Sequence, residues 1–549
     1  MILGILLLAL AAAPVSARDS TSYPSAEALQ RYTQGRLLEE EGDIDGALGE
    51  YYHVLTSDPR SLEAMRRISD LCAQRGDLNR SLEFAERALV VAPNDARSLW
   101  LKGSALFNLG RSTEALASLQ KCVAADSEQA EYWRTLGRVA ERENRLDLVE
   151  HAYEETVDLE DGDAEAWFQL AGARARLGDF AGADSALAQS KDLNPLRPGT
   201  DFLQAWIDEG LGNDDSAIEM YKHHLSVHPD DTATRQRLVS LLAGRQRWDE
   251  AYREAKRVRE ARPSDPEALE TEADLAFHAG QPQAGEERLR ALRALDSNDP
   301  QWVWRSAVVL SRHQRAAEGV RLAGDWEKAH PGDWRGPMLL ARAESLNNDF
   351  DRALAHAREA VSLAPDSLAA RVLLGRVSQQ AKHWSEAAEV WEKLRQEHPD
   401  QPGILLDLAF CKEQMGDVDG SVAVARQALS MAPSQPDVLN FLGYLLADHN
   451  RDLAEASELI QKAVAQEPDN GAFIDSLGWV YYRLGRLKEA REQLERAVRL
   501  TGGDPVVREH LGDVYRDLKL PELAREQYRK SLASDSTNQR VRSKLEATR

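Results

Sequence analysis

The chain has 549 residues, with 68 Lys and Arg against 91 Asp and Glu, and its formal net charge of −23 is spread along its length. This balance argues against binding to nucleic acid or anionic lipid, because both need basic stripes that neutralise phosphate. The three cysteines, Cys72, Cys122 and Cys411, are scattered and odd in number. They predict small apolar side chains within helices rather than a disulfide framework.

The first 17 residues, MILGILLLALAAAPVSA, are uncharged, largely apolar, and end in the small-x-small sequence VSA. This pattern predicts a secretory signal peptide cut after Ala17, and therefore an exported protein of the periplasm or the outer membrane. A membrane anchor is the alternative, but the run from Ile2 to Ala13 has only 12 residues. A helix needs about 20 to span a bilayer, so we expect no stable membrane span. Residues 18–27 are expected to be a flexible lead-in.

A proline, or a residue standing in its place, recurs every 34 residues along almost the whole chain. The positions are Pro59, Pro93, Ser127, Asp161, Pro195, Pro229, Pro263, Ser297, Pro331, Pro365, Pro399 and Pro433, then, after one added residue, Pro468, Gly502 and Ser536. A fixed period of this size indicates stacked copies of one supersecondary unit. Fifteen repeats fill residues 28–538 and leave 27 residues before them and 11 after, too few for a catalytic domain. The sequence therefore predicts a protein that is not an enzyme.

Each repeat is predicted to be a helix, a tight turn and a second helix. In repeat 14, residues 471–504, apolar residues at helical spacing stop at Leu484-Gly485 and then resume from Leu487. The glycine is expected to end the first helix as a left-handed cap. After each second helix, a proline stops the helix and a following Asn, Asp or Ser caps the next one, as in Pro93-Asn94-Asp95.

Small residues recur in register at two repeat positions, where they are expected to let the paired helices approach closely. The eighth position is glycine at Gly35, Gly103, Gly137, Gly375, Gly443, Gly478 and Gly512. The twentieth is alanine at Ala47, Ala115, Ala183, Ala217, Ala251, Ala353, Ala387, Ala456, Ala490 and Ala524.

These repeats resemble the tetratricopeptide repeat (TPR) family over about nine-tenths of the chain. The family pattern is carried by Trp133 and Leu136-Gly137 in repeat 4, and by Leu477-Gly478, Tyr481 and Ala490 in repeat 14. The resemblance implies an all-α fold, a right-handed α-α superhelical solenoid of about fifteen helix-turn-helix repeats. The sequences LNFLGYLLAD and DSLGWVYYRLGRLKEA also resemble the C-terminal repeats of exported bacterial TPR proteins.

The middle of the chain, residues 266–367, departs most from the family pattern. Repeats 8 and 9 carry Glu272 and Ser306 at the family's Leu position, and repeat 9 has Gln314 in place of the turn glycine. We expect degenerate repeats here rather than a separate domain. Residues 539–549 are predicted to form a C-terminal capping helix with a polar outer face.

Partner binding is predicted in the concave groove, which the first helix of each pair lines in TPR proteins. The resemblance implies exposure at the second, fifth, ninth and twelfth repeat positions. The candidates there are Asn440, Tyr444, Asp475, Trp479 and Tyr482 in repeats 13 and 14, Phe168, Phe202 and Trp206 in repeats 5 and 6, and Trp100 and Phe107 in repeat 3. Aromatic side chains in a groove are typical of binding hot spots. The alternative is that the repeat pattern places aromatics there for helix packing.

No nucleotide-binding, hydrolase or zinc-protease motif occurs, and no cofactor is predicted. The cluster of His223, His224 and His228 has the residue type of a zinc site, but metal sites also need convergent geometry. We expect no metal there, with two solvated histidines and one in the hairpin interface.

The sequence thus predicts a non-catalytic scaffold of the bacterial cell envelope, which binds a protein partner in its groove to organise a larger assembly. The alternative is a carbohydrate-linked role: binding polysaccharide, or serving as accessory subunit of an export or glycosyl-transfer machine.

Overall fold

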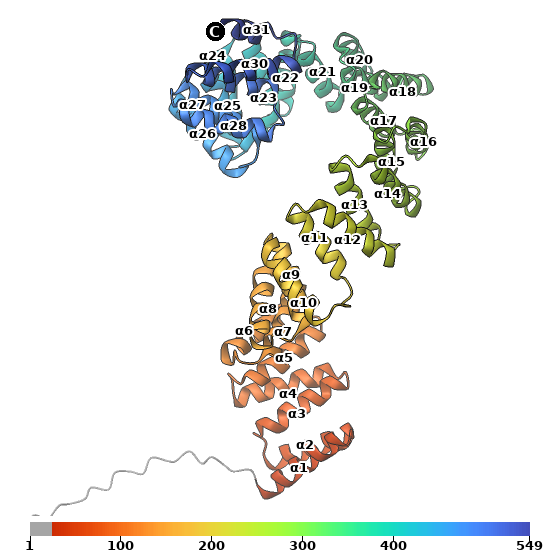
Figure 1. Cartoon of the computed structure of the whole chain (residues 1–549), viewed down its shortest axis with the longest axis vertical. Helices are drawn as coiled ribbons and strands as arrows, with labels where there is room; N and C mark the ends of the chain where they lie inside the picture. Colours follow the sequence, from red (N-terminus) through yellow and green to blue (C-terminus); the bar gives the residue numbers. More distant parts are fainter. Residues whose placement is uncertain (1–24, 549) are drawn as a thin grey trace, which may run out of the picture. The chain divides into compact units, whose positions relative to one another are not determined.

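The computed structural model describes residues 25–548, and every regular element in that range is a helix (Figure 1). The predicted signal peptide lies outside the described residues. Thirty-one helices follow one another, and each odd-numbered helix from α1 to α29 packs against the next as a hairpin. The predicted all-α solenoid fold is therefore confirmed. The chain divides into two compact units at Ala261–Arg262.

The N-terminal unit holds seven helix pairs. They are α1 (Ala26–Glu40) and α2 (Ile44–Ser57), α3 (Leu62–Gln74) and α4 (Leu78–Val91), α5 (Ala96–Asn108) and α6 (Ser112–Ala125), α7 (Ala130–Arg142) and α8 (Leu146–Leu159), α9 (Ala164–Leu177) and α10 (Phe180–Leu193), α11 (Thr200–Gly210) and α12 (Asp214–Val227), and α13 (Thr232–Gly244) and α14 (Trp248–Ala261).

The C-terminal unit holds eight pairs and a last single helix. They are α15 (Pro266–His278) and α16 (Pro282–Arg293), α17 (Pro300–Arg312) and α18 (Ala316–Ala329), α19 (Arg335–Leu346) and α20 (Phe350–Leu363), α21 (Leu368–Gln380) and α22 (Trp384–Glu397), α23 (Pro402–Gln414) and α24 (Val418–Met431), α25 (Pro436–Asp448) and α26 (Leu453–Gln466), α27 (Gly471–Arg483) and α28 (Leu487–Leu500), α29 (Pro505–Asp517) and α30 (Pro521–Ser534), and α31 (Gln539–Ala547).

The turn inside each hairpin has one residue in the left-handed region at the fifteenth repeat position. Glycine supplies it in eight repeats, as at Gly485 with φ of 75°. Seven other residues adopt it without glycine: Asn144, Gln246, Gln314, Asn348, Lys382, Asn450 and Lys519. The predicted left-handed cap is confirmed, and the turn geometry persists where the glycine is missing. The added residue lies in the α25–α26 turn, where Asp452 as well as Asn450 has positive φ.

The small residues at the eighth position make room for one large side chain of the partner helix. A Cβ built on Gly478 would lie 2.6 Å from Leu494 Cγ, and one built on Gly375 would lie 2.6 Å from Trp391. All ten alanines at the twentieth position are fully buried. The close approach predicted for both positions is confirmed.

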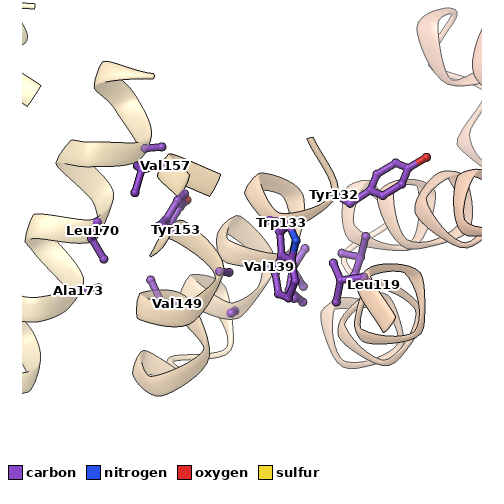
Figure 2. Close-up of a cluster of buried hydrophobic side chains, with 14 of the residues drawn as sticks. Leu119, Tyr132, Trp133, Val139, Val149, Tyr153, Val157, Leu170 and Ala173 are labelled. Atoms are coloured by element: carbon purple, nitrogen blue, oxygen red, sulfur yellow. The ribbon is translucent and has the colours of Figure 1, made fainter. Parts of the chain in front are cut away.

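The core of each unit is a layer of side chains held between successive hairpins. Figure 2 shows part of it, where Trp133 of α7 and Tyr153 of α8 lie among aliphatic side chains of α6 to α9. The three cysteines are buried and free, as their positions predict. No helix within residues 25–548 is both long and apolar enough to cross a membrane.

The odd-numbered helices form one face of each unit, called here the first-helix face. Consecutive first helices contact one another, for example α3 with α5 and α9 with α11 in the N-terminal unit, and α25 with α27 in the C-terminal unit. No comparable contact joins consecutive even-numbered helices in the described chain. The first-helix face is therefore the inner side of the helical layer.

The middle repeats keep the helix-pair pattern although their cores contain polar groups. Glu272 and Ser306 are buried at the position where most other repeats have leucine, and Glu344 is buried against His356 at 2.7 Å. Pro282 and Pro521 each begin a second helix, where the missing backbone N–H breaks no helical bond.

Candidate functional site

Trp479 lies at the centre of the first-helix face of repeats 13 to 15. Its ring stacks on Tyr482 at 5.0 Å between centroids and on His510 of α29 at 4.1 Å. The indole Nε1 donates a hydrogen bond to Asp448 Oδ1 at 3.1 Å. Both its ring and its polar atom therefore have partners within the protein, and the side chain is buried.

Asp475 and His510 form a buried pair beside Trp479. The His510 Nδ1 to Asp475 Oδ1 distance is 2.9 Å, and the two residues are 4% and 7% exposed. Burial opposes the charged imidazole, but Asp475, helped by Asp513 and Glu509, raises the pKa of His510 above its usual value. This pair joins α27 to α29 by a charge-assisted hydrogen bond.

Tyr482 and Tyr444 have more exposure but are also engaged. The Tyr482 hydroxyl donates to Asp517 at 2.8 Å, and burial together with that contact raises its pKa to about 12. Burial and the nearby acids, Asp448 first among them, raise the pKa of Tyr444. Asn440 differs from both, because its buried Oδ1 has no hydrogen-bond donor within residues 25–548.

The last helix, α31, neutralises two buried carboxylates of α29. Lys544 Nζ lies 2.7 Å from Glu509 Oε1 and 2.5 Å from Asp513 Oδ2, and Arg540 lies 2.8 Å from Glu509 Oε2. Burial alone would raise the pKa of Glu509, but these two cations hold it below its usual range. Polar side chains of α31 thus pair with buried acids as well as covering the outer face.

Two of the five residues predicted to line the groove in repeats 13 and 14 are not exposed. Asp475 and Trp479 are each 7% exposed, so the prediction that they face open solvent is wrong. His510 covers both, stacking on one and pairing with the other. Asn440, Tyr444 and Tyr482 are half-buried. These side chains hold the C-terminal repeats together, and partner binding by this set stays a prediction.

The aromatic candidates of repeats 5 and 6 are half-buried beside other side chains. The Arg197 guanidinium lies 3.1 Å from the centre of the Phe168 ring, and Arg237 lies 5.3 Å from that of Trp206. Phe202 instead contacts Tyr221 and His224. Each cation is itself held by a carboxylate, Arg197 by Glu165 and Arg237 by Glu209.

A different arrangement surrounds Phe107, and we call Phe107, Asn108, Arg138 and Arg142 the Phe107 surface. The guanidinium carbons of Arg138 and Arg142 lie 5.8 and 5.7 Å from the centre of the half-buried Phe107 ring. Both arginines are exposed, and neither has an ion pair within the described residues. Phe107 is among the predicted groove residues, whereas its two arginines, from the ninth and thirteenth positions of the following repeat, are not.

The histidine cluster of α12 has the arrangement expected from the sequence. His223 and His228 are exposed and His224 is half-buried in the hairpin. His223 hydrogen-bonds Asp201 at 2.8 Å and His224 hydrogen-bonds Asp231 at 3.1 Å. These two rings therefore contact different carboxylates.

Sequence models of the tetratricopeptide repeat match more than half of the chain. One matches residues 380–445 and 449–513, a second matches 32–98, 100–148 and 338–402, and a third matches 507–538.

Curated relatives match over stretches of the chain. A TPR repeat-containing protein of Pseudomonas aeruginosa is 30% identical over 186 residues, 33% of this chain and 31% of that protein. Cellulose synthase 2 operon protein C of Komagataeibacter xylinus is 27% identical over 366 residues, 58% of this chain and 27% of that protein. Cellulose synthase operon protein C of Pseudomonas fluorescens is 26% identical over 316 residues, 52% of this chain and 23% of that protein. The matched stretch thus spans less than a third of each of these relatives.

Solved helical-repeat structures align along nearly the whole chain at low identity. A structure of Naa15/Naa10 bound to HypK-THB aligns at 15% identity with a TM-score of 0.43, covering 94% of this chain and 96% of the other. The Cut9–Hcn1 structure aligns at 14% identity with a TM-score of 0.37, covering 95% and 96%.

Proposed function

Because the chain belongs to the tetratricopeptide repeat family, we propose that it is a non-catalytic scaffold that binds a protein partner on its first-helix face. Stacked repeats suit such contacts, because they present a long surface and each repeat adds contact area. We further propose that the protein is exported and works in the bacterial cell envelope, which rests on the apolar N-terminal segment.

The Phe107 surface is the observation that carries the proposal. Arginine and aromatic side chains dominate the energetics of protein interfaces, and here two exposed arginines without an ion pair in the described chain flank one ring. Their charge favours an acidic segment of the partner. Because the chain as a whole is acidic, two such arginines would help to fix where that segment binds.

A carbohydrate-linked role is the second candidate. Two of the relatives are named for cellulose synthase operons, and one of them matches 58% of this chain. In this alternative the scaffold would support polysaccharide synthesis or export, either by contacting the polysaccharide or by holding a subunit of that machinery.

Crosslinking and purification of the full chain from the envelope fraction of its host tests the proposal. Wild type is compared with Arg138→Ala/Arg142→Ala, which removes the two charges beside Phe107. The matched control is Arg80→Ala/Arg87→Ala, which removes two exposed charges from α4, a second helix.

We expect one defined protein to co-purify with wild type and with the control, and to fall about tenfold or more in the Phe107-surface variant. Equal recovery from both variants would contradict this binding surface. Saturable quenching of tryptophan fluorescence by oligosaccharide, with no co-purifying protein, would favour direct polysaccharide binding.

A further inference from the structure

Three side chains with metal-ligating atoms converge between repeats 8 and 9. Asp274 and His278 lie one turn apart on α15, and His313 follows the last residue of α17. One ligand atom from each lies within 4.8 Å of the other two. Nothing in the proposed partner-binding role uses this cluster.

The cluster is already tightly arranged. His313 Nε2 lies 3.0 Å from Asp274 Oδ1, and the His278 and His313 rings meet at 70° with centroids 4.5 Å apart. Phe277 packs on His313 at 5.0 Å and limits its rotation. Arg312 is a more distant neighbour, with its Nη1 3.9 Å from Asp274 Oδ1. Only His278 is exposed, so one side of the cluster is open to an ion from solvent.

We propose that Asp274, His278 and His313 bind a divalent transition metal ion of the zinc class. Two imidazoles and one carboxylate suit zinc and its neighbours, whereas calcium and magnesium prefer an all-oxygen set. Zinc–ligand bonds of about 2.0–2.1 Å place tetrahedral ligand atoms about 3.4 Å apart. His313 Nε2 and Asp274 Oδ1 already lie 3.0 Å apart, and binding would require the His278 ring nitrogen to approach them from its present distance of 4.8 Å or less. A water completes the fourth position.

A second acid–histidine cluster provides an internal comparison. Glu413, Asp448 and His449 also converge within 4.8 Å, but they offer one imidazole and two carboxylates. Asp448 is held by the Trp479 indole, and Glu413 lies 2.9 Å from His449. This set is less suited to a nitrogen-preferring metal, because its second nitrogen ligand is missing.

The consequence of metal binding would be a crosslink between adjacent first helices. Repeats 8 and 9 place the polar residues Glu272 and Ser306 in the core at the position where most other repeats have leucine. An ion bound to α15 and α17 together stabilises the folded state, because the unfolded chain does not hold the three ligands in place.

The test uses the untagged full chain, stripped of metal by chelation and titrated separately with Zn²⁺ and Co²⁺. Calorimetry measures affinity and stoichiometry, and the visible spectrum of bound Co²⁺ reports its coordination. The variants are His278→Ala, which alters an exposed side chain, and Asp274→Asn. The matched control is His223→Ala, an exposed histidine outside the cluster that contacts Asp201. Circular dichroism verifies that each variant is folded.

We expect a site of one ion per chain, tetrahedral Co²⁺ absorption, and a rise in melting temperature on adding Zn²⁺. Affinity should fall about tenfold or more in His278→Ala and Asp274→Asn and stay unchanged in His223→Ala. Absence of Zn²⁺ binding, or binding that survives both cluster variants, would overturn the proposal. Loss of binding in a His449→Ala variant instead would overturn it in favour of the second cluster.

Discussion

Two buried carboxylates near the C-terminus share one cation, a lysine of α31. Lys544 contacts Glu509 and Asp513, whose side chains are 1% and 4% exposed. Removing Lys544 leaves Glu509 with Arg540 and Asp513 with Arg516, so both buried carboxylates lose part of their compensation. We predict that Lys544→Ala lowers the free energy of unfolding of the C-terminal repeats by about 1–3 kcal/mol, measured by urea denaturation.

Lys530→Ala is the matched control for that measurement. Lys530 pairs with Glu526 one turn earlier on α30, and both side chains are about half exposed. Exposed pairs of this kind contribute about 0.5 kcal/mol or less. Equal effects of the two substitutions would mean that α31 does not compensate the buried acids.

His510 makes the stability of the C-terminal repeats depend on pH. Its raised pKa means that the folded state holds the proton more tightly than the unfolded state. The resulting stability is fully present below the unfolded value of about 6.5 and is lost as pH rises through the folded pKa. We predict a lower urea midpoint at pH 9 than at pH 6, and a smaller difference between the two in His510→Gln. An unchanged difference in that variant would assign the dependence to other groups.

The sequence correctly predicted which residues lie on the first helices, but it predicted the exposure of Asp475 and Trp479 wrongly. Asp475 and Trp479 do lie on a first helix, as the repeat register requires. Their burial depends on His510 of the next repeat, which lies 35 residues after Asp475 and 31 after Trp479, and which bonds the first and stacks on the second. Exposure therefore follows from how tightly neighbouring repeats pack, which the register of one repeat does not specify.

Glycine has two separate roles in the helical hairpins, close packing and left-handed backbone conformation, and substitution by alanine distinguishes them. A Cβ on Gly478 would meet Leu494 Cγ at 2.6 Å and the Ala490 carbonyl oxygen at 3.3 Å. A Cβ on Gly485 would meet no atom within 4 Å, but that residue has φ of 75°. Alanine is thus opposed by packing at one position and by backbone conformation at the other.

We predict that Gly478→Ala lowers the free energy of unfolding by about 1–3 kcal/mol, since the helices must separate. Gly485→Ala should lower it by about 1 kcal/mol, through left-handed backbone strain alone. Lys382→Gly, at the position equivalent to Gly485, should instead raise it by relieving that strain. Denaturant midpoints measure all three, and a destabilising Lys382→Gly would contradict the backbone explanation.

Helix positions were predictable from the sequence because each repeat has its own start and stop signals. Asp95 caps α5 by accepting a hydrogen bond from the Ser98 N–H at 2.8 Å, as its place after Pro93 indicates. The position of the one added residue was less well defined by the sequence. The spacing shows only that it lies between Pro433 and Pro468, which are 35 residues apart instead of 34. The structure places it in the α25–α26 turn, where a lengthened turn leaves the flanking helices in register.

The chain consists of two compact units that meet in sequence at Ala261–Arg262. Buried apolar side chains continue to Val258 in the N-terminal unit and begin at Ala268 in the C-terminal unit. We predict that residues 18–261 and 262–549, expressed separately, each fold with the helical content of the intact chain and melt cooperatively. Circular dichroism measures this, and an unfolded fragment would show that the units depend on each other.

We propose that a protein partner binds the first-helix face at the Phe107 surface. The most direct measurement is site-specific photocrosslinking in the host, with a benzophenone side chain at Asn108 of α5 or at Asp158 of α8. Both positions are exposed, and they lie on a first and a second helix respectively. We expect a discrete crosslinked protein from Asn108, none from Asp158, and loss of the product in Arg138→Ala/Arg142→Ala. Crosslinking from Asp158 alone, or a product unaffected by the arginine substitutions, would contradict the proposal.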